Sequence, residues 1–353
     1  SKGVIMKKEL LMASALVSTL GVASVAQAVT ATMAGSMKVG VEFESNDSST
    51  TDSNTVMDQS NFNISLSETT DGGTTISTSF EIVDEGTVAA DDDNAIKLTF
   101  TDGSALELLN AGNAAGTHAA AVPGASGEQG IAGTSSNNAP GDLDFAAGSS
   151  VLGVEWHSAA DFLVDGLKMS ASASTDNGAA KAAKARTENS WGVGATYVTT
   201  AGDSTVTISG GIADSETATN ATQASSDKGG FNVGVVAVTG DLTIGVGYGD
   251  GDTYDYEAAN IEIDGSVTKA GIKYVTGDIN MALGVSAGEG KDGAFGSPDT
   301  TDDSIDSTSA SVTYAVASGV SAVIGYTTVD AQNDGASITN AGSAWYIGAS
   351  MSF

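Results

Sequence analysis

The chain of 353 residues has no cysteine, only three prolines and a single arginine. Without cysteine it can form neither disulfide bonds nor thiolate metal sites. Few prolines beside 45 glycines favour long strands and tight turns over disordered linkers. Beyond residue 28, no stretch approaches the ~20 apolar residues that a membrane-spanning helix needs. This hydropathy is typical of an exported soluble protein, and equally of a transmembrane barrel whose strands alternate.

Basic residues are also scarce. The chain has 13 Lys and Arg but 44 Asp and Glu, so its net charge is −31. Such a chain repels phosphate, so no nucleic-acid partner is expected. His118 and His157 are the only two histidines, and nothing in the sequence pairs a nucleophile with a base. We predict no enzymatic activity and no cofactor.

Runs of aspartate at 91–93 and within 299–306 raise the possibility of loop-bound calcium. They lack the ligand spacing and the glycine placement of calcium-binding loops. Solvated loop charge is therefore the favoured interpretation of these runs.

The N-terminal residues 1–28 have the pattern of a secretory signal peptide. Met6, Lys7 and Lys8 form a basic start, an apolar run follows, and Ala26-Gln27-Ala28 is a small-residue cleavage site. We expect an exported protein in which residues 29–353 form one domain.

The last ten residues, Ala344–Phe353, alternate with a period of two and end on an aromatic residue. In a closed antiparallel barrel, a last strand pairs with the first strand and no edge remains. The same alternation recurs in about sixteen segments of about ten residues, beginning at Ser36–Glu44. Short glycine turns such as Thr239–Asp241 alternate with long polar connections. This sorting predicts an all-β, up-and-down transmembrane barrel of about 16 strands.

Charged strand residues fall on the parity opposite the apolar face, apart from Glu68 beside a turn. A Lys facing lipid near mid-bilayer would cost ~2–4 kcal/mol, so this sorting is expected if one face meets lipid. Sixteen strands make a barrel too wide for side chains to fill, and its interior would hold water. The longest connection, Asn110–Gly148, is either a surface loop or a segment folded into the lumen as a constriction.

The signal peptide, the sixteen segments, the long loop after the fifth segment and the terminal aromatic strand together resemble Gram-negative general porins of the alphaproteobacterial type. The resemblance implies homotrimers in the outer membrane, in contact with its lipid. It also implies passive diffusion of ions and small hydrophilic solutes, and a third long loop folded into the lumen opposite basic side chains. Carried over to this sequence, the pore constriction comprises loop acids, wall lysines and inward strand acids. These are Glu128, Asp142 and Asp144, then Lys38, Lys97 and Lys273, and finally Glu42 and Glu107.

The chain departs from that pattern in its single arginine, Arg186, which is expected in an outer loop. No arginine cluster can line the constriction. Inward strand charges look balanced while the acid excess lies in loops, so we expect a modest cation preference that weakens with salt. The alternative to a porin is an exported structural surface protein, such as a surface-layer or adhesin-like β-domain, without channel activity.

Overall fold

The computed structural model describes most of the chain beyond residue 28. The described ranges are 29–46, 53–84, 87–88, 95–109, 112–126, 152–175, 186–218, 225–256, 261–294, 297–333 and 338–353. Within these ranges, no helix has the length and hydropathy needed to cross a membrane.

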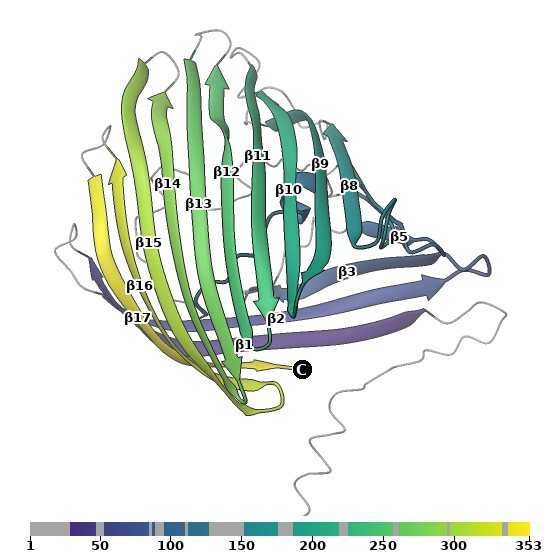
Figure 1. Ribbon diagram of the computed structural model, residues 1–353, viewed down its shortest axis with the longest axis horizontal. Coiled ribbons are helices and arrows are strands. Elements are labelled where there is room, and N and C mark those ends of the chain that lie inside the picture. Colours follow the sequence, from purple (N-terminus) through teal and green to yellow (C-terminus); the bar gives the residue numbers. More distant parts are fainter. Residues whose placement is uncertain are drawn as a thin grey trace, which may run out of the picture.

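The described strands form one antiparallel sheet that closes on itself (Figure 1). Consecutive strands pair, and β17 pairs with β1 to complete the ring. The two-residue strand β4 pairs only with β3, which pairs onward with β5, so sixteen strands make up the ring. The strands are β1 (Thr30–Asn46), β2 (Ser53–Thr69), β3 (Thr75–Asp84), β4 (Thr87–Val88), β5 (Ile96–Thr99), β6 (Ala105–Leu108), β7 (Leu152–His157), β8 (Leu167–Thr175), β9 (Arg186–Ala201), β10 (Ser204–Ala218), β11 (Ser225–Thr239), β12 (Leu242–Tyr256), β13 (Ile261–Thr276), β14 (Ile279–Ala294), β15 (Ser297–Ala317), β16 (Val320–Asn333) and β17 (Ile338–Ser352). The predicted barrel and strand number are confirmed.

Strands β1 and β17 pair, as the alternation of the last ten residues predicts; we call this pairing the seam. Val39 lies opposite Ala349, and Phe43 lies opposite Trp345. At the end of the chain, the backbone N–H of Phe353 donates to Gly35 O at 3.0 Å and Gly35 N–H donates back at 3.2 Å. The last residue therefore takes part in closing the ring.

The predicted length of about ten residues was wrong for most strands: β1, β2 and β9 to β17 have 14 to 21 residues, whereas β5 to β8 have four to nine. The polar residues 288–306 lack the apolar alternation and so would count as a long connection, yet β15 alone has 21 residues and continues pairing into that segment. The apolar alternation marks only the part of a strand that faces an apolar medium, whereas backbone pairing continues beyond it through polar residues. At the other end, the turns are as tight as expected: Thr239 pairs with Leu242, and Gly240 supplies a φ of 56°. We call this end of the ring the turn end.

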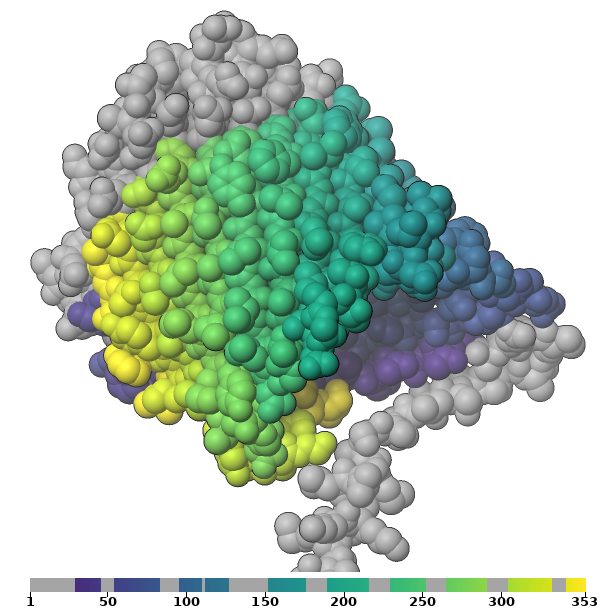
Figure 2. All heavy atoms as spheres, viewed as in Figure 1, coloured from purple at the N-terminus to yellow at the C-terminus, as the bar shows by residue number. Residues whose placement is uncertain are grey.

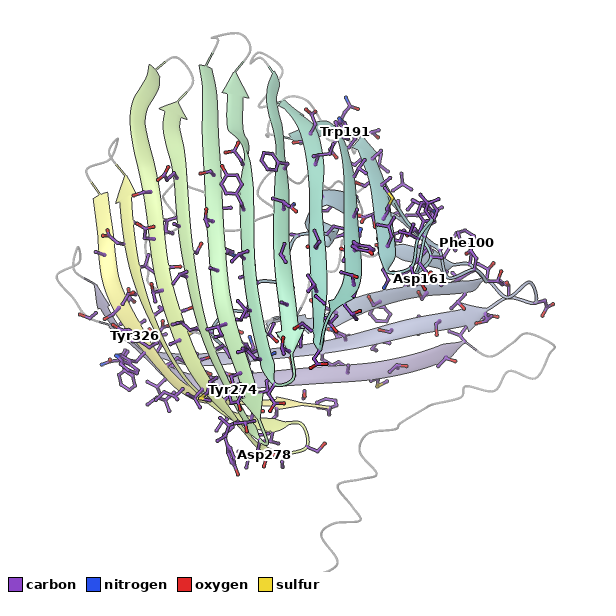
Figure 3. The ribbon with its side chains drawn as sticks, in the orientation of Figure 1. Phe100, Asp161, Trp191, Tyr274, Asp278 and Tyr326 are labelled. Atoms are coloured by element: carbon purple, nitrogen blue, oxygen red, sulfur yellow. The ribbon has the colours of Figure 1, made fainter. Side chains whose placement is uncertain are left out.

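Large apolar side chains lie on the outside of the ring. Ile347 is 55% exposed and Leu283 is 45% exposed, and many others on the same parity resemble them. Figure 2 shows the continuous outer wall over the C-terminal strands. In Figure 3, Trp191 lies toward one rim of this wall and Tyr274 lies toward the turn end. An exterior of this kind matches lipid, with aromatic residues toward its two boundaries.

The buried residues are small rather than bulky, so the barrel has no ordinary hydrophobic core. They are mostly alanines and serines, and Val267 is the largest side chain that is almost completely buried among the described residues. Several of them, including Ala114, Ala115 and Ala120, belong to a segment of chain that lies against the inside of the wall.

Candidate pore constriction

The described start of the longest connection, residues 112–126, lies inside the ring. We call this segment the inner loop. It contacts inward-facing residues of successive strands: its backbone accepts a hydrogen bond from Asn232 of β11, and its Ser126 N–H donates to Ser311 of β15 at 2.7 Å. The predicted inward fold is confirmed for this segment, and the rest of Asn110–Gly148 lies outside the described residues.

Wall glycines make room for the inner loop. A Cβ atom at Gly211 of β10 would lie 2.6 Å from Ala115 Cα, and one at Gly245 of β12 would lie 2.7 Å from Pro123 Cδ. Both distances are too short for non-bonded carbon atoms. The backbone of the inner loop therefore lies directly on the backbone of the wall, which sets how far the segment projects into the lumen.

A buried carboxylate fixes the start of the inner loop. The short helix α2 (Ala114–Thr117) has Asn113 as its N-cap, whose side chain accepts from Gly116 N–H at 3.0 Å. Glu155 of β7, only 3% exposed, accepts from Asn113 N–H at 3.0 Å and from the Thr117 hydroxyl at 2.8 Å. These hydrogen bonds to an ionised acceptor are stronger than neutral ones and compensate for burying the carboxylate.

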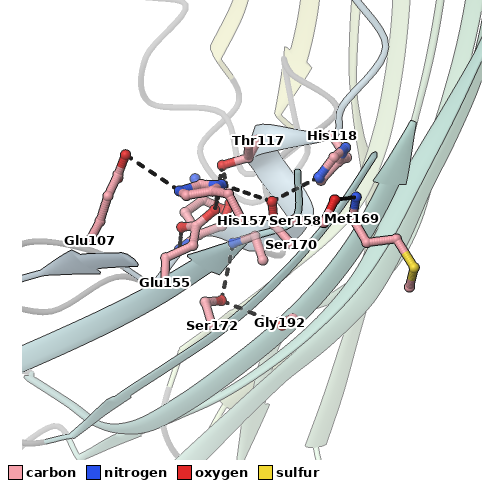
Figure 4. A network of polar contacts seen from close by, with 12 residues as sticks. Glu107, Thr117, His118, Glu155, His157, Ser158, Met169, Ser170, Ser172 and Gly192 are labelled. Atoms are coloured by element: carbon pink, nitrogen blue, oxygen red, sulfur yellow. Dashed lines mark hydrogen bonds and ion pairs between the residues drawn. The ribbon is translucent and has the colours of Figure 1, made fainter. Parts of the chain in front are cut away.

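A chain of polar side chains continues from that point along the wall (Figure 4). His118 of the inner loop lies 2.7 Å from Thr196 Oγ1 through Nδ1 and 2.9 Å from Ser170 Oγ through Nε2. The same Ser170 oxygen lies 2.9 Å from Nδ1 of His157 on β7. His157 Nε2 in turn lies 3.4 Å from Glu107 Oε1.

Two of the predicted site residues meet at the end of this chain. Lys97 Nζ donates to Glu107 Oε1 at 2.6 Å, between neighbouring strands β5 and β6. The Lys97 side chain is 45% exposed and that of Glu107 is 27% exposed, so solvent screens the pair and its contribution to stability is modest. Lys97 is therefore neutralised locally and adds little net charge to the lumen.

The other predicted wall residues also face the lumen. Lys38 lines a cavity of about 380 Å³ beneath Ser126, together with Asn280, Thr313 and Tyr346. Glu42 is 9% exposed and lies opposite Tyr346, at the β1–β17 seam.

Lys273 has inward parity on β13, half-buried, opposite Ala282. The loop acids Glu128, Asp142 and Asp144 lie outside the described residues, so the structure does not bring them together with these side chains.

Inward charge is balanced among the strand side chains that the structure describes. Five carboxylates lie on β1 to β7, whereas the lysines continue onto β8 and β13. The carboxylates are Glu42, Glu44, Glu81, Glu107 and Glu155, and the lysines are Lys38, Lys97, Lys168, Lys269 and Lys273. The balance expected from the sequence is present.

Sequence reasoning missed the anchoring residues. His118 and His157 were considered only as catalytic candidates, and the roles of Glu155 and Ser170 have no sequence signal beyond their polar parity. One catalytic pattern was also overlooked: Gly284–Gly288 reads Gly-Val-Ser-Ala-Gly. Its serine lies within β14, paired with Ser307, rather than at the strand-to-helix turn that a hydrolase nucleophile requires.

The described residues contain no group of three His, Asp or Glu side chains placed to hold a metal ion. The aspartate run 91–93 lies outside the described residues, as do the side chains of 299–303. The described residues therefore do not test whether these runs are solvated loop charge, as the sequence favours, or bind calcium.

A profile of a family described as Gram-negative porin matches residues 13–335. No protein of curated function is significantly similar in sequence. Among solved structures, an anion-selective porin from Comamonas acidovorans aligns with a TM-score of 0.67 at 10% identity, over 92% of this chain and 100% of that chain. OmpT of Vibrio cholerae in its trimer form aligns at 0.62 and 18% identity, over 93% and 100%. Salmonella typhi OmpF in complex with daunomycin aligns at 0.57 and 14%, over 92% and 98%. At these identities the structural likeness concerns the fold.

Proposed function

Because the chain belongs to the Gram-negative porin family and forms an outer-membrane channel, we propose that it passes ions and small hydrophilic solutes by passive diffusion, with a modest preference for cations. The observation that carries the proposal is the inner loop, which lies along the inside of a closed ring whose inward side chains are mostly serine, threonine and charged residues. A polar lumen narrowed by a fixed segment selects by size rather than by a dedicated ligand.

The cation preference follows from where the unbalanced charge lies. The described inward strand charges balance, so the net charge of −31 resides mainly outside the lumen wall. Acidic groups at a pore mouth enrich cations locally, and at about 0.15 M salt this effect is screened within about 8 Å. The preference is therefore expected to weaken as salt rises.

We place the narrowest region between the inner loop and the opposite wall. Lys38, Lys273 and Glu42 would border it from the wall. Glu128, Asp142 and Asp144 would contribute from the continuation of the loop. The pair Lys97–Glu107 would act mainly as a support, because its charges compensate each other.

Assembly into homotrimers is supported by the outer face of β2. Asp58 is exposed on the outward parity, opposite Val39, which is 41% exposed in the apolar band. Asn54 and Ser60 lie on the same face. A carboxylate facing lipid tails would be destabilising, so contact with another copy of the chain accounts better for this surface.

Residues 1–28 would be removed on export, which sequencing of the mature N-terminus tests.

Reversal potentials across a salt gradient test the selectivity. We expect values of cation-preferring sign at low salt that approach zero at high salt. A strongly anion-selective reversal potential in dilute salt would contradict the proposal.

A further inference from the structure

Glu68 is a charged strand residue on the apolar parity, and the pore does not account for it. It follows Ile64 and Leu66 on the outward face of β2 and lies opposite Ile76 of β3. Its side chain is half-buried, and within the part of the chain that the structure describes, no hydrogen bond or ion pair involves its carboxylate. A carboxylate at the edge of an apolar face is stabilised by a nearby cation.

The lysine side chains that the structure describes do not supply this cation. All of them have inward parity, whereas Glu68 has outward parity. The charged residue closest to Glu68 along the chain is Asp71 of the following turn, and it is also acidic. A cation from this part of the wall therefore has to be a group other than a side chain.

The register of β1 against β2 points to the backbone of Val29. Thr30 pairs with Ser67, so the antiparallel register brings Val29 opposite Glu68 (Figure 1). Both residues also border one hollow of about 330 Å³, which Leu66 and other apolar side chains line. Residues directly opposite each other on antiparallel strands have Cβ atoms ~4.5–5.5 Å apart. The carboxylate of Glu68 can therefore reach the backbone nitrogen of Val29.

This nitrogen becomes a cation when the signal peptide is removed. The predicted cleavage site is Ala26-Gln27-Ala28. Water adds across the bond that follows Ala28, which leaves a carboxylate on Ala28 and a free amine on Val29. An α-amino group has an ordinary pKa of about 7.7–8.0, so it is mostly protonated at neutral pH. Before cleavage, the same nitrogen belongs to a neutral amide.

The start of β1 has a neighbouring strand on one side only. Contact with β17 begins where Gly35 and Phe353 exchange two backbone hydrogen bonds, whereas residues 30–34 pair with β2 alone among the described strands. Strand ends near a chain terminus fray unless they are held in place. An ion pair at Val29 would act at the point where separation from β2 begins.

We propose that removal of residues 1–28 creates an ion pair between the α-ammonium group of Val29 and the carboxylate of Glu68, and that this pair fastens the start of β1 to β2. The proposal rests on the export and cleavage given above. The precursor lacks the cation, so processing strengthens the strand that closes the ring. The pair also accounts for an acidic residue on the outward face, because its partner is the new N-terminus.

The pKa of the α-amino group of Val29 is the direct test. It is obtained from the pH dependence of the acylation rate of the folded, processed protein in detergent, with the modified peptide identified by mass spectrometry. We expect a pKa roughly half a unit or more above the ordinary 7.7–8.0, because a nearby carboxylate favours the charged form. Glu68→Gln should return the pKa to the ordinary range.

Asp278→Asn is the matched control. It removes one carboxylate from a different turn at the same end of the ring (Figure 3) and should leave the raised pKa unchanged. An ordinary α-amino pKa in the folded wild type would overturn the proposal. So would a raised pKa that persists in Glu68→Gln, or a mature chain that begins at a residue other than Val29.

Amide hydrogen exchange tests whether the pair fastens the strand. Protection of the peptide covering 30–35 should fall roughly twofold to fivefold in Glu68→Gln, as expected for a solvent-screened ion pair. Selective acetylation of the α-amino group should lower protection equally. Acetylation of Glu68→Gln should cause no further loss, because each change removes the same interaction.

Additive losses of protection would contradict the ion pair. If Glu68 instead binds the ammonium headgroup of a lipid, Glu68→Gln should lower protection while acetylation has no effect, and that result would also reject the pair.

Both readouts use folded barrels in detergent and do not depend on conductance. A raised α-amino pKa in a protein that conducts no ions would retain the ion pair and reject the channel. An ordinary α-amino pKa in a conducting protein would reject the ion pair alone.

Discussion

At the scale of residues, the constriction depends on groups chosen for size and for hydrogen bonding rather than for charge. Glu155 holds two donors of the inner loop, and Ser170 joins two rings. Wall glycines allow the two backbones to touch. A segment held by so many short-range contacts has a defined height in the lumen, and small changes of side-chain volume should move it.

Gly211→Ala tests this sensitivity. Its added Cβ would lie 2.6 Å from Ala115 Cα, so the inner loop must shift away from the wall. We expect a changed single-channel conductance and a loss of about 1–3 kcal/mol of local stability, measured by hydrogen exchange of the same segment.

Gly124→Ala is the control for that substitution, because a Cβ atom there meets nothing within 4 Å. The two variants add the same methyl group. Equal conductances for the two variants would contradict the close contact of loop and wall.

At the scale of elements, the period-two alternation was sufficient to predict the ring, because lipid on one side and water on the other impose that pattern on each strand. Segments such as Leu242–Tyr248 show it plainly. The alternation did not predict the continuation of β14 and β15 through polar residues that lack an apolar parity.

The sequence could predict that the inner loop folds into the lumen, but not which wall residues it contacts. Its anchors pair residues far apart in sequence, such as Ser126 with Ser311, and no local pattern joins them. The ion pair between Lys97 and Glu107 was not predicted either, because it depends on the register in which β5 and β6 pair.

The seam between β1 and β17 can be tested by a cross-link, since the chain has no cysteine of its own. Gly35 and Phe353 exchange two backbone hydrogen bonds, so the next pair, Ser36 and Ser352, is a non-hydrogen-bonded pair with close side chains. The double variant Ser36→Cys, Ser352→Cys should form a disulfide that stabilises the barrel by about 2–4 kcal/mol. The temperature at which gel migration shifts should rise.

Reduction should return that temperature to the wild-type value, and each single variant serves as a control. Failure of the oxidised double variant to cross-link would show that β1 and β17 are not neighbours in this register.

At the scale of the whole molecule, a balanced inner wall lies within a strongly acidic protein, and the apolar exterior is interrupted on β2. The first feature concerns ion selectivity, and the second concerns the assembly of the barrels. We propose that acidic charge at the pore mouths governs selectivity and that the outer face of β2 is the surface of assembly.

Substitution of Asp58 separates a protein contact from a lipid contact. If another copy covers Asp58, Asp58→Leu should weaken the trimer, as measured by cross-linking and by migration without boiling. If lipid covers it, the same variant should make the barrel more stable and leave the oligomer unchanged, because an apolar side chain suits that surface better.

The most direct test of the account is the single-channel conductance of the purified protein in a planar bilayer. Heat-dependent gel migration of the same sample first establishes that the barrel is folded, since an exported structural surface protein without a closed barrel would not show it. We predict discrete steps, grouped in threes, that reflect a water-filled pore narrowed by the inner loop. Folded barrels that give no conductance at any voltage would contradict the central claim that this ring is an open channel.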